Sequence, residues 1–123
     1  MATSNTESAE RRILRRAREL LARGWAQGVY CRDSSGHALL LSEAYGRSDV
    51  CYCIAGAVST AAVDLGKPSW GLAAADAARL LQKAGRLSGD GPWMAIGTYN
   101  DARWRTQADM LALIDAAIAG AAL

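Results

Sequence analysis

Two cysteines stand one residue apart, Cys51 and Cys53, directly before an apolar pattern that is typical of a helix. Cys53 falls in the first turn of that predicted helix, where the positive end of the helix dipole favours a thiolate. With His37 as the base and Asp101 as the orienting group, this thiolate could serve as a cysteine nucleophile. The alternative is that Cys53 is a small buried residue. We favour this alternative because free cysteines are among the most buried residue types.

A zinc site is the second chemistry that these residues suggest, with four soft ligands in Cys31, His37, Cys51 and Cys53. Their spacing, C-x5-H-x13-C-x-C, is not that of the usual zinc motifs. Side chains two residues apart on a helix point about 200° apart, so the last two cysteines could share a metal only if Cys51 precedes the helix. We therefore predict no metal and no other cofactor.

A polar stretch near the C-terminal third, "YNDARWR", is the third candidate for chemistry. Here Trp104 could stack on a planar ligand while Arg103 or Arg105 holds an anion. The structural alternative is that Asn100 and Asp101 form an Asx-turn that leads into the next helix. This alternative is the interpretation that we favour.

The first predicted helix carries a run of arginines opposite its apolar stripe. Arginine side chains suit phosphate groups, and such contacts would give salt-dependent binding to a nucleic acid. However, no helix-turn-helix motif or sheet platform is recognisable, and no aromatic residue stands among these arginines. A charged face of this kind is usually only solvated. We expect a protein partner before a nucleic acid, with a partner surface made of Arg11, Arg12, Arg15, Arg16 and Arg18.

The composition of the chain indicates its class. It has 123 residues, which is enough for one hydrophobic core. Of these residues, 51% are hydrophobic and 21% are charged. Alanine dominates the apolar residues, and because alanine is the strongest helix former, a mainly α fold is predicted. An odd count of three cysteines, a polar N-terminal stretch and no long apolar run predict a cytoplasmic protein with reduced thiols and no membrane contact.

The hydrophobic periodicity predicts four principal helices, at about residues 6–23, 50–65 and 72–84 and from Thr106 onward. A Ser4–Glu7 capping box is expected at the start of the first helix, and Thr106 is expected to cap the last. Alanine-rich stripes should pack these helices closely, with the tryptophans filling the gaps between them.

The predicted minor elements lie between these helices. Residues 28–32 and 37–41 are expected to pair as a hairpin or to include a short helix, and "WMAIG" to form a short strand or turn. The prediction is thus one compact domain over residues 1–123, mainly α with minor β, in which residues 1–6 form a flexible tail.

Three short motifs follow one another along the chain: "GWAQG", "CIAGA" and "YNDARWRT". Together they resemble a family of small bacterial and phage proteins known as a domain of unknown function, over about residues 10–118. The chain departs from the family pattern at Tyr99, where the family more often has tryptophan, and in an insertion between the first two motifs. The residues that match are Trp25, Gly28, Cys53, Gly56, Ala57, Asn100, Asp101, Arg105 and Thr106. The resemblance implies no reaction.

These observations predict a small non-enzymatic binding or regulatory protein, and the resemblance implies an association with phages or mobile elements, for example in anti-defence. The alternative is a small-ligand-binding protein or enzyme whose site gathers Trp25, Cys53, Asn100 and Asp101. Cys53 and Gly56 are expected to act as one unit that lets "GWAQG" or "YND" approach closely. The predicted binding residues are Trp25, Asn100, Asp101, Arg103, Trp104 and Arg105.

Overall fold

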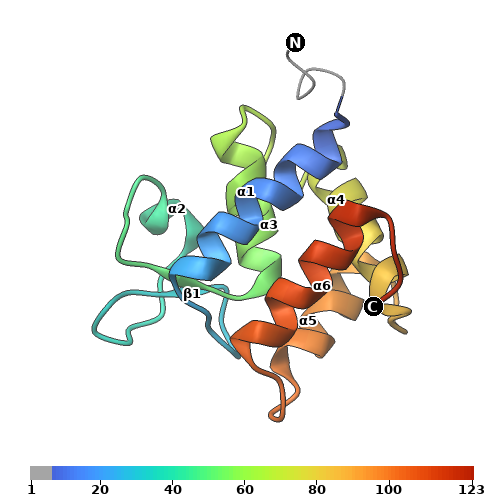
Figure 1. Ribbon diagram of the computed structural model, residues 1–123. Coiled ribbons are helices and arrows are strands. Elements are labelled where there is room, and N and C mark those ends of the chain that lie inside the picture. The colour runs from blue at the N-terminus through green and yellow to red at the C-terminus, as the bar shows by residue number, and fades with distance from the viewer. Residues whose placement is uncertain (1–6) are drawn as a thin grey trace.

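The computed structural model describes residues 7–123, which form a mainly helical fold with a very small sheet (Figure 1). In chain order the elements are α1 (Ala9–Arg23), β1 (Cys31–Arg32), α2 (Leu41–Ala44), β2 (Cys51–Tyr52), α3 (Ile54–Asp64), α4 (Leu72–Gly85), α5 (Pro92–Asp101) and α6 (Gln107–Ala119). The predicted fold class, mainly α with minor β, is confirmed. Within residues 7–123, no helix has the length and apolar character needed to cross a lipid bilayer.

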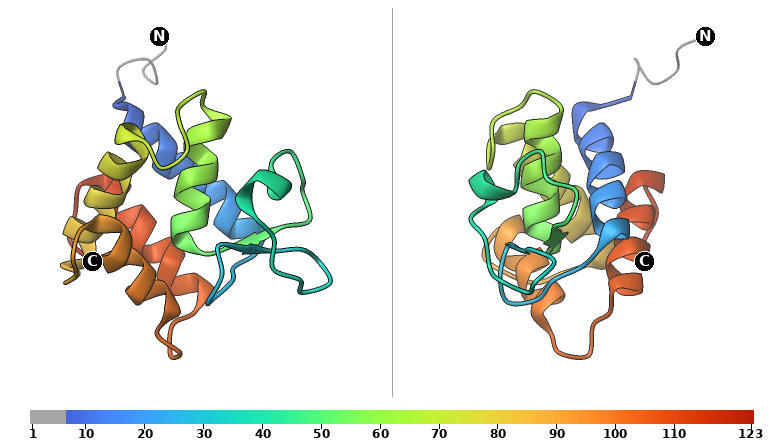
Figure 2. Two further views of the ribbon diagram at one scale, coloured as in Figure 1. Left: turned by 180° about the vertical axis from the view of Figure 1, so that it is seen from behind. Right: turned by 90° about the vertical axis from the view of Figure 1, so that its left-hand side faces the viewer.

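The helices form two layers, with α1 and α6 side by side in one and α3, α4 and α5 in the other (Figures 1 and 2). Helix α1 holds the layers together because it packs against α3, α4 and α6. Its apolar stripe is buried, as the periodicity predicts, and consists of Ile13, Leu14, Ala17, Leu20 and Leu21. Alanines are four of the five buried residues of α4, which lets neighbouring helices approach closely.

The capping residues set where the helices begin. Helix α1 starts at Ala9, and its N-cap is Ser8, whose Oγ accepts from the backbone N–H of Arg11 at 3.3 Å. The expected capping role of Ser4 and the expected flexible tail of residues 1–6 lie outside the described residues. At the other end of the chain, Thr106 caps α6 in a reciprocal capping box with Asp109, and the predicted helix start is confirmed.

The sheet differs from the predicted hairpin. Strand β1 pairs antiparallel with β2, which places Cys31 opposite Tyr52. The expected pairing of residues 28–32 with 37–41 is reduced to one isolated bridge between Arg32 and Ala38. The turn explains the short pairing, because Asp33 Oδ1 accepts from the backbone N–H of His37 at 2.9 Å and turns the chain tightly.

Two helix predictions need correction. The helix expected from residue 50 begins only at Ile54, because Cys51 and Tyr52 form β2 and Cys53 is the N-cap. The "WMAIG" stretch, expected to be a strand or turn, lies inside α5. Pro92 stands at the first position of this helix, where its missing N–H and fixed φ are tolerated. The helix buries Ala95, Ile96, Tyr99 and Asn100, a helical spacing that includes a polar side chain.

Candidate functional site

Asn100 joins three distant parts of the chain at the centre of the candidate site. Its side chain is fully buried. Its Oδ1 accepts from Trp25 Nε1 at 2.8 Å and from the backbone N–H of Ile54 at 2.9 Å. Its Nδ2 donates to the carbonyl of Ala26 at 3.0 Å and to Asp101 Oδ1 at 2.9 Å. All four hydrogen-bonding positions of the amide are therefore used, and they tie the segment after α1 and the start of α3 to the end of α5.

The neighbours of Asn100 reinforce this junction. Asp101 Oδ1 also accepts from the backbone N–H of Gly28 at 3.0 Å. Gln27 Nε2 donates to the carbonyls of Asn100 and Ala102 at 3.0 and 2.9 Å, where the last carbonyls of a helix lack partners within it. The expected Asx-turn into α6 is therefore wrong, since Asn100 and Asp101 end α5 and bind the segment after α1.

Cys53 and Gly56 form the part of the junction that lies at the start of α3. Cys53 is the N-cap, and its Sγ accepts from the backbone N–H of Gly56 at 3.2 Å. The backbone N–H of Cys53 donates to the carbonyl of Tyr30 at 3.0 Å. A side chain at Gly56 would collide with that same carbonyl oxygen. The two residues thus act as one unit that admits a neighbouring segment, as the sequence predicts. The expectation that this segment is "GWAQG" or "YND" is wrong, because the backbone that approaches Gly56 is that of Tyr30, just after "GWAQG".

The environment of Cys53 does not favour a nucleophile. Burial raises the pKa of its thiol to about 11, so the thiol is protonated at neutral pH. His37 is exposed and its Nδ1 lies 3.7 Å from Asp33 Oδ2. No hydrogen bond joins His37 to Cys53 or Asp101 in the described part of the chain. Nor do three His, Cys, Asp or Glu side chains gather as metal ligands anywhere in residues 7–123.

An open groove of about 1100 Å³ lies over the junction. Five residues that the sequence singles out contribute to its lining: Gly28, Cys53, Asn100, Asp101 and Trp104. The remainder is mostly apolar and aromatic. We call this feature the aromatic groove, after the large side chains that line it: Tyr30, Trp70, Trp93, Met94 and Trp104.

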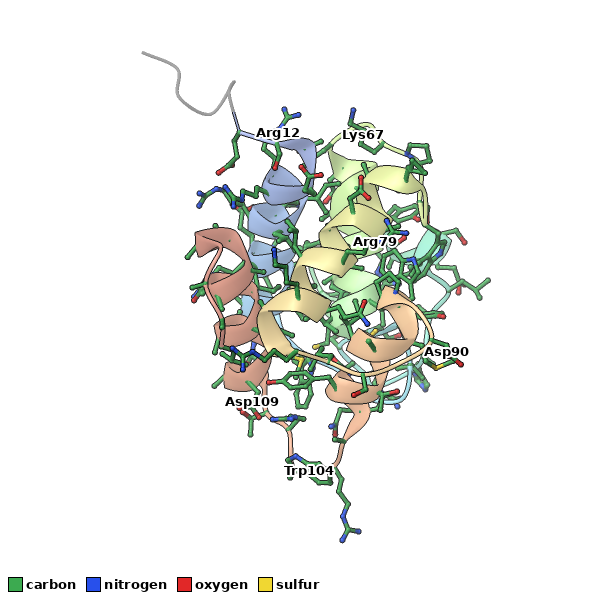
Figure 3. The ribbon with its side chains drawn as sticks, turned by 90° about the vertical axis from the view of Figure 1, so that its right-hand side faces the viewer. Arg12, Lys67, Arg79, Asp90, Trp104 and Asp109 are labelled. Atoms are coloured by element: carbon green, nitrogen blue, oxygen red, sulfur yellow. The ribbon has the colours of Figure 1, made fainter. Side chains whose placement is uncertain are left out.

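The aromatic groove has one packed wall and one projecting side chain. Trp70 packs against Tyr30, with ring centroids 5.1 Å apart, and edge-on against Trp93, with centroids 4.8 Å apart. Trp104 stands apart from this row, at the tip of the loop between α5 and α6, and projects away from the helices (Figure 3). Its side chain is 72% exposed and that of Met94 is 60% exposed. The groove therefore combines a fixed aromatic wall with exposed apolar residues.

The structure separates the predicted binding residues into two groups. One group lines the groove: Asn100, Asp101 and Trp104. In the other group, Trp25 supports the groove from below through its hydrogen bond to Asn100, and Arg103 is exposed in the loop after α5. The guanidinium of Arg105 stacks over the Tyr99 ring, 3.8 Å from its centroid, so this arginine stabilises the loop from within.

The arginines of α1 are partly neutralised by carboxylates of the same chain. Three of the five that form the predicted partner surface make ion pairs: Arg15 with Glu7, Arg16 with Glu19 and Asp64, and Arg18 with Asp115. Arg12 lies at the opposite end of the molecule from Trp104 (Figure 3). Binding of a partner to this face stays a prediction, and it concerns a surface distinct from the aromatic groove.

Sequence reasoning missed the aromatic wall. The tryptophans were expected to fill gaps between helices, yet Trp70 is 40% exposed and Trp104 is mostly exposed. Tyr30, Trp70 and Trp93 are far apart in sequence. Trp70 lies between Ser69 and Gly71, and Trp93 directly follows Pro92, so neither tryptophan belongs to a predicted apolar stripe. A large aromatic residue outside any periodic apolar pattern was the available signal, because such a residue has no core position to occupy.

Comparison with known proteins identifies the family of the chain. A family model described as "Family of unknown function (DUF6197)" matches residues 5–120. No curated protein and no solved structure matches the chain. The matched range includes all three motifs that meet at the Asn100 junction. The chain therefore belongs to the DUF6197 family, a family of unknown function.

Proposed function

We propose that this chain is a non-enzymatic binding protein that holds an apolar segment of a protein partner in the aromatic groove. The observation that carries the proposal is the clustering of exposed apolar side chains. Eight large hydrophobic residues are exposed in the described part of the chain, and four of them line this one groove: Tyr30, Trp70, Met94 and Trp104. An exposed apolar cluster of this kind typically marks an interaction site.

The residue types support a protein partner. Tryptophan, tyrosine and methionine are enriched in the cores of protein interfaces, and tryptophan and tyrosine are frequent binding hot spots. The groove has a volume of about 1100 Å³, which is at the upper end for small-molecule sites and leaves room for a chain segment. The four hydrogen bonds of Asn100 hold the base of the groove in place before a partner arrives.

The buried junction supports a binding role over catalysis. Cys53, the strongest nucleophile candidate, has a raised pKa and uses its sulfur to cap α3. Asp101 uses one carboxylate oxygen to hold Gly28 and Asn100. These groups serve the architecture of the groove, while its apolar side chains are exposed to a partner.

A selection from a random phage-displayed peptide library, followed by calorimetry with the selected peptides, tests the proposal. We expect Trp104→Ala to weaken binding by about tenfold or more, because an exposed aromatic anchor of an interface is lost. Leu72→Ala is the matched control, since Leu72 is 79% exposed on α4 and does not line the groove.

Two outcomes would overturn the proposal. In one, the selected peptides bind the Trp104→Ala and Met94→Ala variants as tightly as they bind the unchanged protein. In the other, no peptide is selected, but the neutral dye N-phenyl-1-naphthylamine binds and Trp104→Ala abolishes its binding. The second result would favour the alternative of a small-ligand-binding protein.

A further inference from the structure

We propose that the partner segment presents a lysine or arginine side chain to Asp101, with apolar residues on either side of it; this inference rests on the proposed function. Among the described residues that line the aromatic groove, Asp101 alone carries a charge. The site therefore has a single negative group within an apolar and aromatic surface.

The hydrogen bonds of Asp101 leave one oxygen for a partner. Oδ1 accepts from the backbone N–H of Gly28 and from Asn100 Nδ2. Within residues 7–123, Oδ2 accepts no hydrogen bond, and the residue is exposed. Because Oδ1 is anchored twice, the carboxylate is held in a fixed position and Oδ2 is available to a cationic side chain.

The two helix ends at the Asn100 junction, the start of α3 and the end of α5, favour a cation over an anion beside Asp101. The first N–H groups of α3 would attract an anion, but Ile54 donates to Asn100 Oδ1 and Gly56 donates to Cys53 Sγ. By contrast, α5 ends at Asp101, and the partial negative charge of a helix C-terminus adds to the carboxylate. The groove therefore offers acceptors, while these N–H donors are already used.

The aromatic rings suit the rest of such a side chain. The methylene stem of a lysine or arginine packs on apolar surface, and its charged end is attracted to the face of a tryptophan. Trp93 and Trp104 both line the groove together with Asp101. Of the nearby arginines, Arg105 is stacked on Tyr99 and neither it nor Arg103 lines the groove, so neither occupies this position.

Three small probes that differ only in their end group test the inference: 4-phenylbutylamine, 4-phenylbutan-1-ol and 4-phenylbutyrate. Binding is followed by NMR through the indole N–H signals of Trp93 and Trp104. We expect the amine to bind about fivefold more tightly than the alcohol, and the carboxylate to bind most weakly. Salt at about 0.5 M should reduce the preference for the amine and leave the alcohol unaffected.

Asp101→Asn is the diagnostic variant, because an asparagine keeps an oxygen for Gly28 and Asn100 but lacks the charge. It should bind the amine and the alcohol equally. Asp76→Asn removes a carboxylate that pairs with Arg79 on α4 outside the groove, and this control should keep the preference. If Asp101→Asn does not fold, as judged by circular dichroism, the order of the three probes and its salt dependence decide the question.

The outcomes separate the inference from the proposed function. If no probe shifts the indole signals and no peptide is selected, both fail. If the probes bind without a preference for the amine, or Asp101→Asn keeps that preference, the inference fails and the groove stands as a binding site. Selected peptides should contain a basic residue, and its replacement by norleucine should weaken binding about fivefold. Selected peptides without a basic residue would overturn the inference even if the amine is preferred.

Discussion

Cys53 shows at the residue scale how burial decides the chemistry of a side chain. Its pKa of about 11 in the folded protein exceeds the ordinary thiol value of 9.0. Between these two pH values the folded state binds more protons than the unfolded state, so the free energy of unfolding falls as the pH rises. The contribution of the protonated Cys53 thiol to the free energy of unfolding is fully present below about pH 9. It is lost as the pH rises through about 11, and the free energy of unfolding falls by a total of about 3 kcal/mol for this group.

Urea denaturation at about pH 8 and about pH 10.5 measures the effect. Burial also raises the pKa of Cys31, Tyr52 and Tyr99, so the pH dependence of the unchanged protein has several sources. Cys53→Ala isolates the contribution of this one thiol. We expect the unchanged protein to lose about 2 kcal/mol more than Cys53→Ala between the two pH values. An equal loss in both proteins would show that the Cys53 thiolate is tolerated in the fold.

At the scale of the element, α3 and α5 each contain an internal glycine, and the two glycines have different roles. Around Gly97 there is room for a methyl group, with no atom within 4 Å of an added Cβ. At Gly56 the same methyl group would collide with the carbonyl oxygen of Tyr30. We expect Gly97→Ala to stabilise the protein by about 0.5–1 kcal/mol through helix propensity. Gly56→Ala should destabilise it by about 2 kcal/mol, because the contact with the Tyr30 segment must open.

The two variants are controls for each other, because each places an alanine inside a helix. Thermal and urea denaturation of both proteins give the comparison. Shifts in the same direction would contradict the distinction between a glycine that permits close approach and one that only lowers helix propensity.

The elements that the sequence predicts best are those with an apolar stripe and a cap. Helices α1 and α6 meet both conditions, for example through the Thr106 cap of α6, whereas α4 has the apolar stripe without a side-chain cap. Helix α5 does not, because its buried face includes Tyr99 and the amide of Asn100 and its interior contains Gly97. Hydrophobic periodicity cannot detect a helix whose central contacts are hydrogen bonds to distant segments. The prediction of a strand or turn there was wrong for this reason.

The same reasoning explains what could be predicted of the site. The three motifs indicate the junction, because each motif contributes one residue to it: Trp25, Cys53 and Asn100. The aromatic groove is made by segments that come together only in the folded chain, such as those of Tyr30, Trp70 and Trp93. No local pattern links these aromatic residues, so the sequence predicted a junction but no groove.

At the scale of the whole molecule, Asn100 connects the N-terminal, middle and C-terminal thirds of the chain. Its partners Trp25 and Ile54 lie 75 and 46 residues away in sequence. We expect Asn100→Ala to lower the free energy of unfolding by about 3–4 kcal/mol, because the Trp25 indole N–H and the Ile54 N–H lose their acceptor in a buried site. The aromatic groove rests on this junction, so binding of the selected peptides should weaken together with stability.

Gln82→Ala is the matched control, because it removes one amide that makes a single hydrogen bond, to the carbonyl of Leu87 within one part of the chain. Gln82→Ala should lower the free energy of unfolding by about 1 kcal/mol and leave ligand binding in the groove unchanged. Urea denaturation followed by both tryptophan fluorescence and circular dichroism tests whether each variant unfolds in one transition. If Asn100→Ala costs no more than Gln82→Ala, packing of the alanine-rich helices alone holds the three thirds together. The amide would then only shape the groove, and the Asn100→Ala variant should lose binding of the selected peptides without losing stability.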